Sequence, residues 1–429
     1  MTRLLAAEYQ SSSDWIRRSA EEHGIIEFDL QTTLIEASKR ISSNLNLKEP
    51  ALSVAGHGLD VAGVAGLVRL APNLELEVIP KFLNPNDERW REDFFFLANL
   101  SSHGAILSRD QLRASDHAKN DLASLVGKYM VDEFELLRRR PLRSYVNTEL
   151  REWAIDGDLD STEILTPEEE GFLQRRLILT KDNSFNMVIV AAVLSLLPLV
   201  EDLGVRNRLV RMRDDLSPQA KLVTKPTKRT LPNRHSHWQP LYDISVQILN
   251  GLGMGLIDGN LNSPGYVMNT WRVWEDLIRR CMTLRFGAKA VYHQRHQLGT
   301  ANGNKSVLVT PDVTVSLDGG TTVLVDAKYK GRFNLSNRIS SADLYESLAF
   351  MDASQSKQTI LVYPMNGDVA EGVTSTGDFN VFEKIDVRDL TVIGAEIDVR
   401  NISSKWGFRK FSNGLEQLVR AHSKSTNTQ

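Results

Sequence analysis

The chain has 429 residues, enough for two or three domains, and its 41% hydrophobic and 24% charged residues are typical of a globular protein, which excludes a disordered or fibrous one. The single cysteine, Cys281, excludes an internal disulfide, so stability must come from packed cores. A net charge of −3 excludes tight binding of duplex DNA by overall charge alone, because that requires many basic side chains facing phosphates.

Residues 1–87 predict a β-rich N-terminal domain. Apolar stretches at 25–30, 51–70 and 74–82, separated by glycine and Asn-Pro signals, are typical of strands and turns. The first residues lack an apolar segment followed by a small-residue cleavage site. We therefore expect no secretory signal and a cytoplasmic protein.

Residues 88–215 predict a mainly helical middle domain with a hairpin. Apolar residues recur at every third or fourth position in 93–100 and 125–140, whereas 153–180 is typical of a hairpin or extended segment. The longest apolar run, 187–200, is shorter than the roughly 20 residues that span a membrane. It predicts a core helix, and no association with a membrane is expected.

Residues 216–240 predict a Pro-rich basic linker. Prolines at this density break any regular element, and the basic side chains fit a solvated connection better than a strip that tracks DNA. The prolines concerned are Pro218, Pro226, Pro232 and Pro240.

Residues 241–429 predict an α/β domain with the order helix, three strands, helix, strand. A single apolar face predicts a helix at 268–285, formed by Trp271, Trp274, Ile278 and Cys281. A second helix is expected to be capped by Ser340 or Ser341. The expected strands are 288–295, 307–317, 321–329 and 359–364. The chain beyond 415 is expected to fray.

The stretch "TPDVTVSLDGGTTVLVDAKYK" at 310–330 predicts a hairpin with unusual charges. If Asp-Gly-Gly forms a three-residue turn, Leu317 faces Thr321, and the same register places Asp312 directly opposite Asp326. Their Cβ atoms would then lie roughly 4.5–5.5 Å apart. Two carboxylates would therefore share one face of the sheet.

Asp326 and Lys328 point to the same face, because side chains alternate along a strand. Two facing aspartates repel each other, and a bound divalent cation removes this conflict. Carboxylate oxygens suit Mg²⁺, with Mn²⁺ as the alternative, and an adjacent lysine can orient or deprotonate a metal-bound water that hydrolyses a phosphodiester. The other interpretation is an exposed hairpin with a solvated charged face.

Glu275 lies on the predicted helix at 268–285, one turn from Trp271 and Ile278 and hence at the border of its buried face. It could lean toward the strands and supply a further metal ligand. It could equally be a surface glutamate in an arginine-rich helix.

The segment "GTANGNKS" at 299–306 is the nearest approach to a phosphate-binding loop. It has Asn304 where the Walker pattern requires glycine, and it lies between strands instead of opening a helix. Any nucleotide hydrolysis should therefore come from another chain.

The ordered motifs resemble the PD-(D/E)XK nuclease superfamily and, more narrowly, the McrC family, the nuclease subunits of McrBC-type modification-dependent restriction systems. The closer resemblance rests on "MNTWRVWEDLI", "TPDVTV", "VLVDAKYK" and "ADLYESLAF" followed by "ILVYP". Upstream, "LEVIPKF", "FELLRRRPLRSYV", "IDGDLD" and "DNSFN" follow the same family's order, so the resemblance covers roughly 50–365. The chain departs from the pattern at 156–158, where many relatives have a Leu-Arg-Gly-type turn, and at Glu346, where glutamine is common.

The resemblance implies an α+β multidomain protein with a C-terminal αβββαβ nuclease core, and a Mg²⁺-dependent DNA endonuclease subunit of an anti-phage restriction complex. Lys328 would position the attacking water, and Lys330 and Tyr345 could touch the DNA backbone. The implied metal ligands are Asp312, Asp326, the Ala327 carbonyl and Glu275.

The resemblance also implies a McrB-like AAA+ GTPase hexamer as partner, which binds the GTP and recognises modified or site-specific double-stranded DNA. Regions up to about residue 240 would dock onto this partner and stimulate it. Two alternatives remain: a non-cleaving DNA-binding activator of an AAA+ motor, and a stand-alone restriction or repair nuclease. Separate measurements of GTPase stimulation and DNA cleavage discriminate among the three.

Overall fold

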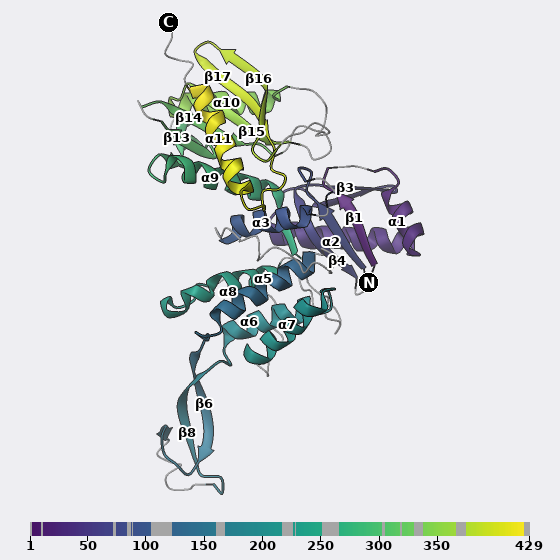
Figure 1. Ribbon diagram of the computed structural model, residues 1–429, viewed down its shortest axis with the longest axis vertical. Helices are drawn as coiled ribbons and strands as arrows, with labels where there is room; N and C mark the ends of the chain where they lie inside the picture. The colour runs from purple at the N-terminus through teal and green to yellow at the C-terminus, as the bar shows by residue number, and fades with distance from the viewer. Residues whose placement is uncertain are drawn as a thin grey trace. The chain divides into compact units, whose positions relative to one another are not determined.

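The computed structural model divides into two compact units (Figure 1). The first comprises Met1–Leu125 and Tyr266–Gln429, and the second Val126–Gly265. This division differs from the predicted boundaries after residues 87, 215 and 240. No helix among the described residues is long and apolar enough to cross a membrane. The structure describes residues 2–9, 12–71, 74–83, 87, 89–103, 122–159, 168–216, 226–227, 229–250, 266–302, 305–317, 320–329, 338–365 and 375–423.

A four-stranded sheet in the first unit joins three N-terminal strands to a strand from the second part of the chain. β1 runs parallel to β5, and β4 is antiparallel to both β5 and β9. Met268 and Asn269, the first two residues of the helix predicted at 268–285, thus belong to the N-terminal sheet, and the helix itself begins at Thr270. In sheet order the strands are β1 (Thr2–Ala7), β5 (Leu74–Ile79), β4 (Val64–Ala71) and β9 (Tyr266–Asn269).

The prediction of a strand at 25–30 is wrong, because these residues lead into a helix. α2 (Glu27–Leu45) follows α1 (Trp15–His23) and precedes the hairpin of β2 (Leu52–Ala55) and β3 (Gly58–Val61). α2 buries side chains at helical spacing, namely Leu30, Leu34, Ala37 and Ile41. A six-residue segment is too short to distinguish this period from that of a strand.

A six-stranded sheet forms the core of the C-terminal part of the first unit (Figure 1). α9 (Thr270–Phe286) precedes it, and α11 (Gly407–Ser423) packs against α9. α10 (Ser341–Ser354), capped by the Ser340 hydroxyl, connects the parallel strands β14 and β15. In sheet order the strands are β10 (Val291–Tyr292), β13 (Val313–Ser316), β14 (Thr322–Ala327), β15 (Gln358–Pro364), β17 (Leu390–Ile397) and β16 (Phe379–Val387).

The elements of this sheet and its helices follow the order α9, β10, β13, β14, α10, β15, which matches the predicted helix, three strands, helix, strand only when the two further strands between β10 and β13 are left aside. The single strand expected at 307–317 is wrong, because the chain leaves one sheet and enters another at Pro311. β12 (Lys305–Val309) pairs only with β11 (His296–Ala301) among the described strands, whereas β13 pairs with β14. Proline lacks the N–H that a continuous ladder would require.

The fraying expected beyond 415 is also wrong. α11 continues to Ser423 and buries an apolar stripe at helical spacing, formed by Phe411, Leu415, Leu418 and Val419. The C-terminal helix is therefore part of the core.

The second unit consists of helices and a long hairpin (Figure 1). The hairpin pairs β6 with β8 from Ser144↔Thr180 to Glu152↔Phe172, so it begins nine residues earlier than the predicted 153. Asn183 caps α6 by accepting hydrogen bonds from the N–H groups of Phe185 and Asn186. The elements are α5 (Leu122–Leu137), β6 (Ser144–Glu152), β7 (Asp158–Leu159), β8 (Phe172–Thr180), α6 (Ser184–Leu196), α7 (Leu203–Leu216), the 3-10 helix η1 (Asn233–Trp238) and α8 (Gln239–Asn250).

The predicted linker at 216–240 is wrong for its last ten residues, which are packed. Trp238 is fully buried, and its indole N–H donates a 2.8 Å hydrogen bond to the Arg140 carbonyl. Leu231 is buried as well. Residues 217–225 and 228 of this segment lie outside the described residues.

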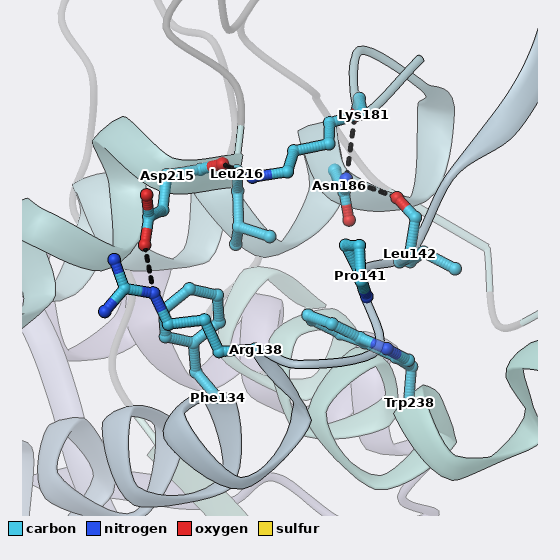
Figure 2. A pocket seen from close by; sticks show the side chains of 9 residues that line it. All are labelled: Phe134, Arg138, Pro141, Leu142, Lys181, Asn186, Asp215, Leu216 and Trp238. Atoms are coloured by element: carbon cyan, nitrogen blue, oxygen red, sulfur yellow. Dashed lines mark hydrogen bonds and ion pairs between the residues drawn. The ribbon is translucent and has the colours of Figure 1, made fainter. Parts of the chain in front are cut away.

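Trp238 lines a small cavity beside the end of α7 (Figure 2). Arg138 forms a 2.7 Å ion pair with Asp215, and the Asn186 amide donates hydrogen bonds of 3.0 Å to the Leu142 carbonyl and 2.7 Å to the Lys181 carbonyl. The cavity measures about 10 Å³, which is room for about one water. These polar contacts therefore brace the second unit and do not form a ligand site.

Candidate functional site

The hairpin of β13 and β14 has the predicted register. The Leu317 N–H bonds to the Thr321 carbonyl at 2.8 Å, and the ladder ends at Val313 opposite Val325. The next pair outward is Asp312 and Asp326. Residues 318 and 319 of the turn lie outside the described residues.

Asp312 is fixed against the end of β14. Its Oδ2 accepts a 2.9 Å hydrogen bond from the Ala327 N–H. The N–H and carbonyl of one strand residue point toward the same neighbouring strand, so the Ala327 carbonyl faces the side on which Asp312 lies. The backbone carbonyl of Asp312 is 3.0 Å from Nδ1 of His293, a contact that the sequence did not indicate.

Lys328 lies between Asp326 and helix α10. Its Nζ is 2.8 Å from Oδ2 of Asp326, 2.6 Å from Oε2 of Glu346 and 3.6 Å from Oδ1 of Asp343. Leu324 packs with Phe350 of α10, so the alternation along β14 directs Asp326 and Lys328 toward this helix.

Sequence reasoning missed Asp343 altogether. The signal was present, because Asp343 and Glu346 are three residues apart on a helix and so share a face. The Tyr363 hydroxyl donates a 3.0 Å hydrogen bond to Asp343, which fixes that carboxylate beside Lys328.

Burial shifts the pKa values of the ionisable side chains in this group. Burial and the charge of Asp312 together raise the pKa of Asp326 to about 6, although Lys328 lowers it. Burial and the charge of Glu275 also raise the pKa of Asp312. Burial opposes the charge of Lys328, but Asp326 and Glu346 outweigh it and raise the pKa of this lysine. The site thus holds more negative charge than one lysine neutralises.

Glu275 interacts electrostatically with both aspartates. Burial raises its pKa to about 7; Arg279 lowers it, whereas Asp276 and Asp326 raise it. Its helix, α9, contacts β13 and β14. Within the described part of the chain, however, no three acidic, histidine or cysteine side chains lie close enough to hold one ion together. Glu275 therefore influences the charge of the two aspartates but does not complete a ligand set of three side chains with them.

The oxygen donors fit a hard divalent cation. Oδ2 of Asp326 is buried and, apart from its ion pair with Lys328, accepts no hydrogen bond of good geometry. Asp312, Asp326 and the Ala327 carbonyl offer two carboxylates and a neutral oxygen. Mg²⁺ typically binds one or two carboxylates and completes its shell with waters.

These pKa shifts predict that the ion-free protein loses stability as the pH rises. The pKa of Asp326 goes from its ordinary 3.8 to about 6 on folding, and that of Glu275 from 4.5 to about 7. The folded state therefore binds more protons between these values, and the stabilisation present below pH 4 is lost through pH 7. Thermal unfolding in chelator should show Tm falling over this window.

Added Mg²⁺ should raise Tm more at the alkaline end of this window, because binding requires ionised carboxylates. Asp326→Asn should flatten the fall in Tm and remove the Mg²⁺ effect. If Mg²⁺ raised Tm equally at every pH, and still did so in Asp326→Asn, Asp326 would not be a ligand of the ion.

Of the remaining predicted positions, some lie outside the described residues. Tyr345 is 67% exposed on α10. Lys330 and Asn304 lie outside the described residues. Described parts of 299–306 belong to the β11 and β12 hairpin, and no helix begins there, as expected for a segment that is not a phosphate-binding loop.

Two chains of solved assemblies share this fold at low sequence identity. One, from the half-complex of the tetradecameric assembly of Thermococcus gammatolerans McrB AAA+ hexamers with bound McrC, matches with a TM-score of 0.71 and 14% identity over 97% of this chain and 100% of that chain. Another, from the Thermococcus gammatolerans McrBC complex, matches with a TM-score of 0.51 and 13% identity over 66% and 87%. No curated protein matches.

A family model described as McrBC 5-methylcytosine restriction system component matches residues 59–364, which is more than half of the chain. The matched range includes the whole hairpin with Asp312, Asp326 and Lys328, as well as β15. The chain therefore belongs to the McrBC 5-methylcytosine restriction system component family.

Proposed function

We propose that this protein is the DNA-cleaving subunit of a McrBC-type restriction complex, a Mg²⁺-dependent endonuclease with a PD-(D/E)XK core that hydrolyses phosphodiester bonds. The observation that carries this proposal is the convergence of Asp312, Asp326 and Lys328 at the end of one hairpin. Family membership and the order of α9, β10, β13, β14, α10 and β15 support it.

Asp312, Asp326 and the Ala327 carbonyl would hold the ion. When bound, Mg²⁺ supplies Lewis acidity and lowers the pKa of a coordinated water. Lys328 keeps its proton because Asp326 and Glu346 raise its pKa, so its Nζ would orient the attacking water and offset charge on the phosphate. Glu275 would add negative charge beside the ligands, and Lys330 and Tyr345 would contact the DNA backbone.

The partner would be an AAA+ GTPase hexamer that binds the GTP and selects modified double-stranded DNA. One of the solved structures with this fold comes from an assembly of McrB AAA+ hexamers with bound McrC, and the other comes from a McrBC complex. The described part of 299–306 is a hairpin, unlike a phosphate-binding loop that opens a helix. Docking would involve the regions up to about residue 240, and these include most of the second unit, Val126–Gly265, which carries none of the site residues.

The β6 and β8 hairpin offers a surface for this docking. Tyr145, Leu177 and Leu179 lie on one face of the strand pair and are 54%, 59% and 44% exposed. Exposed apolar side chains gathered on one face are typical of protein contacts. Leu177→Asp should therefore weaken binding to the partner and lower GTPase stimulation by roughly tenfold or more, as an interface anchor would.

Thr148→Asp is the matched control, since Thr148 is exposed on the opposite face of the same strand pair. GTPase rate and DNA cleavage should be measured separately with the purified partner, GTP and Mg²⁺. Full GTPase stimulation by the wild-type chain without any cleavage would overturn the nuclease assignment. Equal effects of the two substitutions would overturn the docking surface.

A further inference from the structure

A buried polar cluster joins the N-terminal sheet to the candidate site. Its members are Glu8, which follows β1, Lys81, which follows β5, Thr270, the first residue of α9, and Tyr329, the neighbour of Lys328. Glu8 is fully buried and Tyr329 is 3% exposed. Four segments that are distant in the sequence therefore meet at Tyr329, directly after Lys328.

Glu8 is bonded to both elements that carry site residues. Its Oε2 accepts a hydrogen bond from the Tyr329 hydroxyl, and its Oε1 accepts one of 2.6 Å from the Thr270 hydroxyl. The N–H of Lys81 also donates to Oε2, at 3.4 Å. One carboxylate thus ties the chain after Lys328 to the beginning of the helix that presents Glu275.

Lys81 holds the backbone of the same tyrosine. Its Nζ donates a hydrogen bond to the Tyr329 carbonyl and lies 4.5 Å from the centroid of the Tyr329 ring and 5.4 Å from that of Tyr9. The side chain and the backbone of Tyr329 are both fixed from the N-terminal sheet. Because Lys328 precedes Tyr329 directly, these contacts restrict the path along which its side chain leaves the strand.

Placing these charges in the interior is costly. Burial raises the pKa of Glu8 to about 7 and lowers that of Lys81 to about 8. A buried carboxylate and ammonium are often no more stabilising than apolar residues of similar size. Sheet stability alone is therefore a weak reason for this cluster, whereas orientation of neighbouring groups is a specific one.

We infer that Glu8 and Lys81 are positioning residues for cleavage, which orient Lys328 through Tyr329 and Glu275 through Thr270. This inference rests on the proposed nuclease function. It assigns the N-terminal sheet a part in the chemistry, in addition to any part in docking. Substitutions of residues that orient functional groups through hydrogen bonds commonly lower activity by roughly 10- to 100-fold.

A matched pair lies at the other end of the same two strands. Arg3 forms a 3.2 Å ion pair with Glu75, which is fully buried, and the two face each other across β1 and β5. This pair joins a basic and an acidic side chain in the same sheet, but it lies five residues before Glu8 and six before Lys81 along the chain. Arg3→Met therefore removes an ion pair with a buried carboxylate from the same sheet but leaves the contacts of Glu8 and Lys81 with Tyr329 and Thr270 in place.

The experiment uses the full chain assembled with its partner and measures kcat and KM for DNA cleavage, GTPase stimulation and Tm. Lys81→Met and Tyr329→Phe should each lower kcat by roughly 10- to 100-fold, with KM for DNA and GTPase stimulation unchanged. Arg3→Met should leave kcat within about twofold.

The double variant Glu8→Gln with Lys81→Met separates positioning from stability. Lys81→Met alone leaves the charge of Glu8 buried without its cation, and the second change removes that charge. Tm should recover in the double variant, whereas kcat should stay low because the Tyr329 carbonyl still lacks its donor. Recovery of kcat together with Tm, or equal losses in Arg3→Met, would overturn the inference.

Asp312→Asn, assayed in parallel, tests the proposed function itself. If Asp312→Asn cleaves normally, the nuclease site is wrong. If Asp312→Asn is inactive while Lys81→Met and Tyr329→Phe keep full kcat, the nuclease site stands and the positioning role is wrong.

Discussion

Asp312→Asn should abolish Mg²⁺-dependent DNA cleavage by the assembled complex. Asparagine keeps the size of the side chain and can still accept the hydrogen bond from the Ala327 N–H, so the hairpin should remain intact. It loses the negative charge that an ion requires. Since metal assistance contributes several kcal/mol to such reactions, the cleavage rate should fall by roughly 10³-fold or more.

Cleavage of modified plasmid DNA should be followed over time with partner, GTP and Mg²⁺ present. Asp386→Asn is a suitable control, because Asp386 is an exposed aspartate on β16 that bonds to Thr391 at 2.7 Å. It should cut at the normal rate. Asp312→Asn should stimulate the partner's GTPase as the wild-type chain does, and undiminished cutting by this variant would refute the metal site.

Lys328→Met should lower the cleavage rate by roughly 10²- to 10⁴-fold, the usual contribution of a positioned group that assists proton transfer or stabilises charge. Methionine retains the length of the side chain but cannot orient a water or offset charge on the phosphate. The variant still carries Asp312 and Asp326, so it should retain the Mg²⁺-dependent rise in Tm.

Glu346→Gln is the informative comparison, because Glu346 forms the 2.6 Å contact with Lys328 from α10. Glutamine can still accept a hydrogen bond from Nζ, and the loss of one charge leaves Asp326 and Asp343 beside the lysine. Cleavage should stay within a few-fold of wild type. Full activity in Lys328→Met, or loss in Glu346→Gln as large as in Lys328→Met, would show that the lysine does not act as proposed.

The hairpin could be predicted from sequence because its information is local. The turn length sets the register, alternation sets the faces, and both act within 310–330. α9 was predictable for the same reason, from an apolar face at helical spacing. The contacts of Lys328 with Asp343 and Glu346 were not, since they depend on how α10 lies over the sheet.

The failures have different physical causes. Residues 25–30 are too few for the period of their apolar side chains to be read, and the burial of Leu34 and Ile41 further along reveals the helix. Residues 231–240 contain prolines and charges, yet Trp238 buries its ring. The bond from Lys81 to Tyr329 spans 248 positions, a distance over which no sequence period carries information.

The pairing of β9 with β4 also has a consequence for how the chain matures during synthesis. β4 emerges from the ribosome long before β9, so one edge of the N-terminal sheet stays open until about two thirds of the protein has been made. An open strand edge invites pairing with other chains. Val126–Gly265 emerges in between as a continuous segment and can fold first, whereas the first unit closes only when its last strands arrive.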